Sequence, residues 1–168
     1  MSYCYTYPDL PRIGAFLAIY LSLRKFNGLF EALHLIYPVL DVFDEHPSYE
    51  CYGNNYFLDA DKMKWFKSFI TNYCSDIKFN PMELSQEDMD TLPDINIYSA
   101  GFDVLRDESF IFSDKYRLSR KMVIHHHFGN LPHDFCLYSE FITSAKSALN
   151  VIAKNTIVSK LKENKNVN

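Results

Sequence analysis

The sequence lacks the closely spaced cysteine pairs that mark disulfide frameworks and zinc sites. Its four cysteines lie far apart, at Cys4, Cys51, Cys74 and Cys136. Small secreted domains place cysteines at short spacings, because their small cores need covalent cross-links. We therefore predict reduced thiols and a cytoplasmic protein.

The sequence also lacks an apolar run long enough to cross a membrane. IGAFLAIYLSL at 13–23 follows Arg12 and resembles the apolar part of a signal peptide. A bilayer needs about 20 apolar residues, however, and no small-residue cleavage site follows. We interpret this segment as a buried helix over 14–26 that ends near Asn27-Gly28, a common helix stop.

No excess of basic charge is present. The 17 Lys and Arg residues are scattered, and the formal net charge is −4. Nucleic acids and acidic membranes attract clustered positive charge, so neither is expected as the main partner. With 48% hydrophobic and 16% aromatic residues, the 168-residue chain can build one domain with a substantial core.

Three apolar segments have the pattern of strands that are buried on both faces. They are LIYPVL within 32–41, INIYSA at 95–100 and MVIHHHF at 122–128. Continuous apolar runs are typical of parallel sheets, because helices cover both of their faces. Pro38 has no N–H to donate to a sheet, so it either weakens the assignment of this first strand or lies near the strand's end.

Helical patterns lie between and after these strands. The expected helices are 59–74, 106–120 and 137–154, with a short acidic helix within 85–94 that Ser85 caps, and with a loop at 129–135. Alternation of strands and helices predicts an α/β fold with a parallel sheet and right-handed crossovers.

An acid and a histidine each follow the end of a predicted strand. Asp103 comes shortly after the strand at 95–100, and His133 follows the strand at 122–128. In open parallel sheets, functional groups gather at the carboxyl ends of the strands. An acid that accepts an imidazole N–H fixes the tautomer and stabilises the imidazolium, as in a catalytic triad. Spacing alone leaves two alternatives open, a helix cap for Asp103 and an ordinary loop histidine.

The segments around these residues resemble a known family. SAGFDVLRDES at 99–109 resembles the acid-bearing segment of the hormone-sensitive-lipase-like esterases, of the α/β-hydrolase superfamily, which carries a D-x-L-R-D-E motif. NLPHDF at 130–135 resembles the family's histidine loop, usually H-G-F. The segments IYPVLD, PSY, YFLD, MKWF and LPD follow in the family's order, so the resemblance covers about residues 14–150.

The resemblance implies a partial α/β-hydrolase fold with three C-terminal parallel strands, flanking helices and no N-terminal strands. It implies that Asp103 is the triad acid and His133 the general base. Asp134 departs from the family pattern, because it stands where glycine is usual and adds a charged side chain beside the histidine.

The family's nucleophile has no counterpart at the matching position. The family places its serine in a G-D-S-A-G-G turn before the helix that precedes IYPVLD. Laid over LPRIGA at 10–15, this pattern matches Gly14, but Arg12 stands in place of serine. The H-G-G-G oxyanion loop would lie further upstream. The other candidates, none in a glycine-flanked elbow, are Ser22 within a helix, Ser48 in a loop, Ser99 within a strand, and Cys4.

These features together predict part of a carboxylic ester hydrolase that retains acid and base. We expect the chain alone to be inactive, either as a truncated copy or as a non-catalytic pseudoenzyme. The expected division is a divergent stub at 1–13, the hydrolase part at 14–155 and a polar tail at 156–168. By family, the substrate is a small acyl ester or lipid, without a cofactor. The strand around Ile36 would have a bare edge, which predicts poor solubility or a homodimer.

Two further groups of residues have alternative interpretations. His125 and His127 could share a metal ion, because alternate residues of a strand face the same side. Zinc needs three or four converging ligands, so we favour ordinary strand histidines and expect no metal. The stripe around Trp65, with Met63 and Phe66, could line an acyl pocket, but core packing is the favoured interpretation.

Two acids compete with Asp103 for the role of triad acid. Asp107 and Glu108 lie in the first turn of the predicted helix at 106–120, where negative charge suits the helix dipole. We interpret both as structural, with Arg106 as their ion-pair partner.

Overall fold

The computed structural model describes residues 14–24, 28, 30–73 and 79–163. Its centre is a three-stranded sheet, in the order β1 (Ala32–Ile36), β2 (Asp94–Phe102) and β3 (Val123–Pro132). Both strand pairs are parallel, with Leu33 opposite Ile95 in the first pair. The α/β class and the parallel sheet are therefore confirmed.

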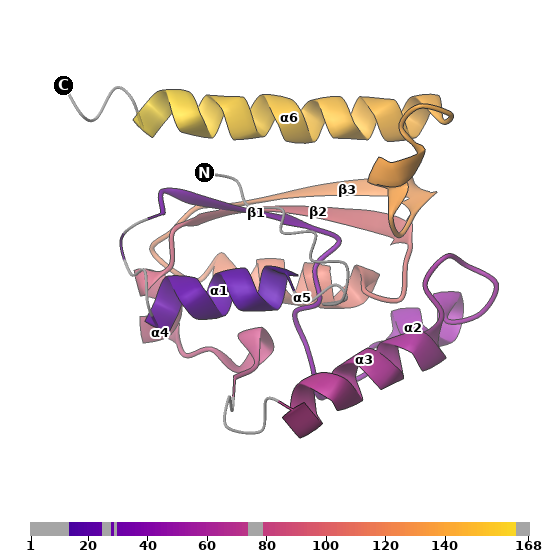
Figure 1. Cartoon of the computed structure of the whole chain (residues 1–168). Coiled ribbons are helices and arrows are strands. Elements are labelled where there is room, and N and C mark those ends of the chain that lie inside the picture. The colour runs from indigo at the N-terminus through magenta and orange to yellow at the C-terminus, as the bar shows by residue number, and fades with distance from the viewer. Residues whose placement is uncertain (1–13, 25–27, 29, 74–78, 164–168) are drawn as a thin grey trace.

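Helices cover both faces of this sheet (Figure 1). The long helix α6 (Thr143–Glu163) lies on one face, and α1 (Gly14–Arg24) and α5 (Arg106–Tyr116) lie on the other. Between β1 and β2 the described residues form three more helices, which are α2 (Pro47–Tyr52), α3 (Ala60–Tyr73) and α4 (Gln86–Thr91). Two 3-10 turns are η1 (Pro81–Glu83) and η2 (Phe135–Tyr138).

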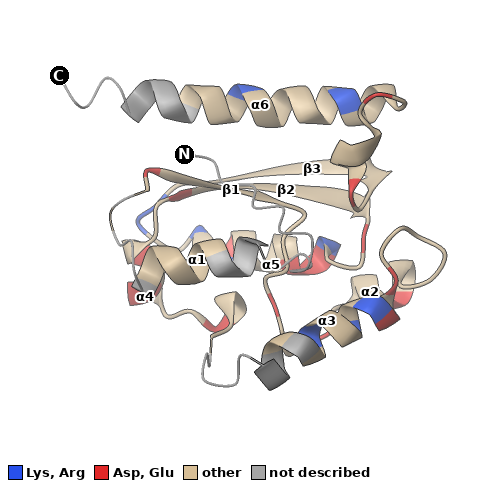
Figure 2. Ribbon diagram, viewed as in Figure 1, with Lys and Arg blue, Asp and Glu red and all other residues tan. Residues whose placement is uncertain are grey.

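The alternation of side chains along β2 divides the core into two parts. Ile95 and Ile97 belong to the larger cluster with α1 and α5, and Tyr98 and Ala100 belong to the smaller cluster under α6. The residues between the two ends of β2 are buried on both faces, which explains its continuous apolar sequence. Figure 2 shows the charged residues mainly on the helices and near the strand ends.

The first strand is shorter than the apolar run predicts. β1 ends at Ile36 because the backbone of Tyr37 turns to a positive φ of 36° and Pro38 has no N–H. The N–H of Tyr37 donates to the carbonyl oxygen of Tyr98 at 2.7 Å, just beyond the last paired residue of β1. The prediction of a strand through LIYPVL was therefore wrong in its second half.

The other differences between the predicted and the observed ends of helices and strands lie mostly after β2. β3 continues to Pro132, so half of the loop predicted at 129–135 is strand. α5 ends at Tyr116 rather than at residue 120. α6 begins at Thr143 rather than at 137 and continues to Glu163, past the expected domain boundary at residue 155. The cap at Ser85 is confirmed, since its side chain accepts the N–H of Asp88.

A close approach of two backbones shapes the carboxyl ends of β2 and β3. The register shifts between Ala100 and Phe102, and Gly101 faces Gly129 there. A Cβ on Gly101 would lie 2.0 Å from the carbonyl oxygen of Gly129. Glycine is required at this position, because any side chain would force the strands apart just before Asp103.

None of the helices in the described part of the chain combines the length and the hydropathy that a membrane span requires.

Candidate active site

The structure brings Asp103 and His133 together at the carboxyl edge of the sheet. Asp103 follows β2 directly and His133 follows β3 directly. The Nδ1–H of His133 donates to Oδ2 of Asp103 at 2.7 Å, and each side chain is 1% exposed. This short, buried contact between an imidazole and a carboxylate is a charge-assisted hydrogen bond. The juxtaposition expected from the sequence is present.

The turn after β2 holds the other oxygen of the Asp103 carboxylate. Oδ1 accepts the N–H of Leu105 at 3.0 Å, and the carbonyl oxygen of Asp103 accepts the N–H of Arg106 at 3.1 Å. α5 begins at Arg106, and its N-cap residue Leu105 makes no side-chain cap. Asp103 therefore stabilises the turn into α5 with one oxygen and orients His133 with the other.

Two residues with unusual backbone conformations flank His133. Tyr37 (φ 36°) and Asp134 (φ 59°) are two of the three non-glycine residues with positive φ in the described ranges. The ring of Tyr37 lies 4.6 Å from the His133 ring. A left-handed backbone suits glycine best, which fits the expectation from the family resemblance that glycine is usual at the position of Asp134. Backbone strain of this kind concentrates at functional sites.

The second ring nitrogen of His133 faces Asp134. Oδ1 of Asp134 lies 3.5 Å from Nε2, and Nε2 has no hydrogen-bond partner among the described residues. Nε2 is the nitrogen that takes the nucleophile's proton in a Ser-His-Asp triad. In the structure, Nε2 of His133 is therefore the ring nitrogen not engaged by Asp103, and the carboxylate of Asp134 lies beside it.

The candidate nucleophiles that the structure describes bond elsewhere. Ser22 donates to the carbonyl oxygen of Ala18 in its own helix. Ser48 lies in α2 rather than in a loop and donates to the carbonyl oxygen of Val104. Ser99 bonds to two other histidines. Arg12 and Cys4, the remaining positions considered, lie outside the described residues.

The three consecutive histidines divide between the faces of β3. His125 Nε2 and His127 Nδ1 lie 2.7 and 2.9 Å from the hydroxyl oxygen of Ser99, whereas His126 stacks on Tyr98 on the other face. The serine has one proton, so it can donate to one imidazole and accept from the other. Burial, followed by the nearby His127, lowers the pKa of His125 to about 4. No group of three or more metal-ligating side chains converges in the described ranges.

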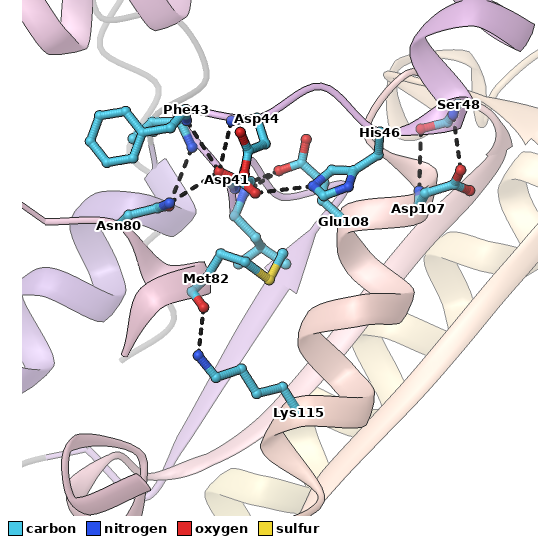
Figure 3. Close-up of polar contacts among 12 residues, drawn as sticks. Asp41, Phe43, Asp44, His46, Ser48, Asn80, Met82, Asp107, Glu108 and Lys115 are labelled. Carbon is cyan, nitrogen blue, oxygen red and sulfur yellow. Dashed lines mark hydrogen bonds and ion pairs between the residues drawn. The ribbon is translucent and has the colours of Figure 1, made fainter. Parts of the chain in front are cut away.

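A second acid–histidine pair follows β1, and sequence reasoning missed it (Figure 3). His46 Nε2 donates to Oδ2 of Asp41 at 3.1 Å. Oδ1 of Asp41 accepts the N–H groups of Phe43 and Asp44 and an amide N–H of Asn80, at 3.1, 3.2 and 3.0 Å. Burial raises the pKa of Asp41, but these hydrogen bonds outweigh it and leave the pKa below its ordinary value.

Glu108 is fully buried, and its role differs from the expected one. Its Oε2 accepts the N–H groups of Leu40 and Asp41 at 2.5 and 2.7 Å. Burial raises its pKa to about 8. It is therefore a structural acid, as expected, but it acts through backbone hydrogen bonds to a distant segment rather than through the helix dipole or Arg106.

Two places bear on where a substrate pocket could lie, the stripe around Trp65 and a hollow beside α5. Trp65 is 60% exposed, so core packing is wrong for this residue although Met63 is buried. A shallow hollow of about 500 Å³ lies against α5, lined by Pro47, Arg106, Asp107, Phe110, Ile111 and His127. It includes neither Asp103 nor His133, so we do not assign the substrate to it.

Comparison with known proteins identifies the fold. Residues 13–137 match a protein family described as alpha/beta hydrolase fold. Among solved structures, a thermostable esterase from Pseudomonas putida is 25% identical, with a TM-score of 0.72 over 82% of this chain and 44% of the esterase. No curated protein matches the chain.

Two further structures match at lower identity and support the fold alone. A thermostable carboxylesterase from a metagenomic library is 23% identical, with a TM-score of 0.72 over 85% of this chain and 50% of that protein. A fungal esterase from Rhizomucor miehei is 21% identical, with a TM-score of 0.68 over 88% and 48%. This chain thus spans about half the length of the esterases that it matches.

Proposed function

This chain belongs to the α/β-hydrolase family, within its hormone-sensitive-lipase-like esterases, and on that basis we propose that Asp103 and His133 are the acid and base of a carboxylic ester hydrolysis site. The observation that carries the proposal is the buried 2.7 Å hydrogen bond between them at the carboxyl ends of adjacent parallel strands. The proposed substrate class is a small acyl ester or a lipid ester, and no cofactor is needed.

The roles of the two residues follow from the geometry. Asp103 accepts the Nδ1–H of His133, which fixes the tautomer whose Nε2 is free to accept a proton. In the proposed reaction, Nε2 takes the hydroxyl proton of a serine as that serine attacks the ester carbonyl. His133 then returns the proton to the departing alcohol, and Asp103 stabilises the imidazolium between these steps.

None of the candidate nucleophiles in the described part of the chain is placed to react with an ester beside His133. Arg12, at the position expected for serine, has no nucleophilic oxygen, and Ser22, Ser48 and Ser99 bond away from His133. We propose that these 168 residues hydrolyse no ester by themselves, because the hydroxyl and the oxyanion donors supply most of the rate enhancement. The second candidate function, favoured by Arg12, is a non-catalytic binding or regulatory protein.

A chimera separates these two functions. The N-terminal part of the Pseudomonas putida esterase, through its nucleophile turn, would be joined to residues 14–168, and hydrolysis of p-nitrophenyl butyrate would be measured beside the chain alone. We expect hydrolysis by the chimera and none by the chain alone or by the chimera with His133→Ala. A folded chimera without activity would refute the acid–base assignment and favour the binding function.

The free edge of β1 is the basis of a proposal about assembly. Among the described residues, β1 pairs with β2 and with no other strand. An unpaired apolar edge promotes pairing with another chain, so we propose a homodimer through β1, in a cytoplasmic setting that keeps Cys51 and Cys136 reduced. Light scattering after size-exclusion chromatography would test it, and a monomer with a sharp, cooperative melt would contradict it.

A further inference from the structure

Three consecutive residues at the start of α5 hold one segment of the chain. Arg106, Asp107 and Glu108 each contact the segment 40–52, which leads from the end of β1 through α2. They belong to the same D-x-L-R-D-E motif as Asp103, but the proposed reaction does not use them. Their contacts show what this part of the motif does.

Glu108 holds the start of the segment (Figure 3). Its Oε2 accepts the N–H groups of Leu40 and Asp41, and its side chain is completely buried. Burying a carboxyl group carries a large desolvation cost, and such costs are concentrated at functional sites. The two bonds fix the direction in which the chain leaves β1.

Asp107 holds the middle of the segment and joins it to the turn of the acid (Figure 3). Oδ2 of Asp107 accepts the N–H of Ser48 at 2.9 Å. The hydroxyl of Ser48 donates to the carbonyl oxygen of Val104 at 2.5 Å. Val104 directly follows Asp103, so this serine links α2 to the residue next to the proposed triad acid.

Arg106 holds the end of the segment. Its Nη1 donates to the hydroxyl of Tyr52 at 2.6 Å, and its guanidinium lies 4.7 Å from the centre of the Tyr52 ring. Its Nε donates to Oδ1 of Asp107 at 2.7 Å, which leaves Oδ2 for Ser48. The expected ion pair of Arg106 is thus with Asp107, and it orients that carboxylate.

We propose that Arg106, Asp107 and Glu108 are positioning residues that tie the segment 40–52 to the turn carrying Asp103, and so hold the Asp103 carboxylate on His133. The inference rests on the proposed function of that pair. Asp103 lies in a turn, and catalytic geometry must be held to within about 0.5 Å by surrounding contacts. The triplet provides contacts to three places in the segment, at residues 40–41, 48 and 52.

Two variants of the full chain test the inference. Ser48→Ala removes the hydroxyl that donates to Val104 and accepts the N–H of Asp107. Glu108→Ala removes the acceptor of the Leu40 and Asp41 N–H groups. Matched controls are Ser147→Ala, which removes a hydroxyl bonded to its own helix on the surface of α6, and Glu108→Gln, which retains an acceptor oxygen.

Two readouts in solution decide the outcome. Amide hydrogen exchange of residues 40–52 should become about 10-fold faster in both test variants, because these hydrogen bonds are lost. The Nδ1 proton of His133, observed by NMR, reports the bond to Asp103. We expect its signal to shift or broaden in both test variants and to remain as in the wild type in both controls.

The possible outcomes have distinct meanings. Unchanged exchange of residues 40–52, or faster exchange with an unchanged His133 signal, would overturn the positioning role. If Glu108→Ala does not fold, as judged by circular dichroism, Ser48→Ala alone decides. A wild-type protein without the Nδ1 signal would instead refute the Asp103–His133 pair, and with it the proposed function.

Discussion

The molecule contains two acid–histidine pairs at the same edge of its sheet, and they differ in how their carboxylates are used. Asp41 accepts hydrogen bonds from two backbone N–H groups, an asparagine and His46. Asp103 accepts from one backbone N–H and His133. The histidine side chain is 15% exposed in the first pair and 1% exposed in the second.

This difference supports our proposal that the Asp103 pair is catalytic, whereas the Asp41 pair stabilises a loop. The Asp41 carboxylate is the centre of a loop, because four donors from residues 43–46 and Asn80 converge on it. Among the described residues, one oxygen of the Asp103 carboxylate accepts only the Nδ1–H of His133. The other ring nitrogen of His133, Nε2, has no hydrogen-bond partner among these residues. An acid next to a histidine is therefore insufficient as a signature of catalysis, and the remaining partners of both residues decide.

The largest expected effect is a difference in how much the protein is destabilised by substitution of Asp41 and of Asp103. Asp41→Ala should lower the free energy of unfolding by about 3–5 kcal/mol, because it leaves several buried donors without an acceptor. Asp103→Asn retains an acceptor oxygen and should cost about 1 kcal/mol. Urea denaturation followed by circular dichroism would measure both. Equal losses would remove the structural distinction between the pairs.

The next effect concerns the pH dependence contributed by Glu108. Its pKa is raised to about 8 in the folded protein, so the folded state binds the proton more tightly than the unfolded state. Stability should therefore fall as pH rises from about 5 to 8 and then level off, and the total loss relative to Glu108→Gln should be roughly 4 kcal/mol, at about 1.4 kcal/mol per pH unit. Denaturation midpoints of both proteins between pH 5 and 9 would show this. A difference in stability between the two proteins that stays constant across this pH range would contradict the raised pKa of the buried Glu108 carboxyl group.

A smaller effect is expected from a substitution at the close approach of β2 and β3, which should disturb the Asp103–His133 pair but not the Asp41–His46 pair. Gly101→Ala should destabilise the protein by about 2 kcal/mol, because its Cβ would overlap the carbonyl oxygen of Gly129. The displacement lies next to Asp103, so the NMR signal of the His133 Nδ1 proton should change. The signal of the His46 Nε2 proton, which bonds to Asp41, should not. Equal changes at both histidines would show that the strand ends do not shape the Asp103 pair specifically.

The sequence was sufficient for one pair and insufficient for the other. β2 was predictable because its apolar run is continuous, and Asp103 and His133 follow strands in a recognisable motif. Asp41 also follows a strand, but its partners and those of Glu108 depend on folding. Glu108 bonds to backbone groups 67 and 68 residues earlier in the chain, and periodicity carries no information about such contacts.

The predicted ends of strands were wrong where the backbone conformation, rather than the pattern of apolar side chains, decides where a strand stops. Nothing in the apolar run LIYPVL indicates that Tyr37 adopts a positive φ, although Pro38 indicated that the strand ends nearby. Gly129, Asn130 and Pro132 are residues typical of loops, but backbone pairing with β2 extends β3 to Pro132. Tertiary pairing thus decided the position of His133 as much as sequence did.

The most direct test of the account is the rate of p-nitrophenyl butyrate hydrolysis by the chimera carrying a nucleophile serine, compared between Asp103→Asn and His46→Ala. The account predicts that Asp103→Asn lowers kcat by about 10⁴-fold, because His133 would then be held in the wrong tautomer. It predicts that His46→Ala changes kcat by less than about threefold. Full activity of the Asp103→Asn chimera, or an equal loss in both variants, would contradict the assignment of Asp103 and His133 as the acid and base.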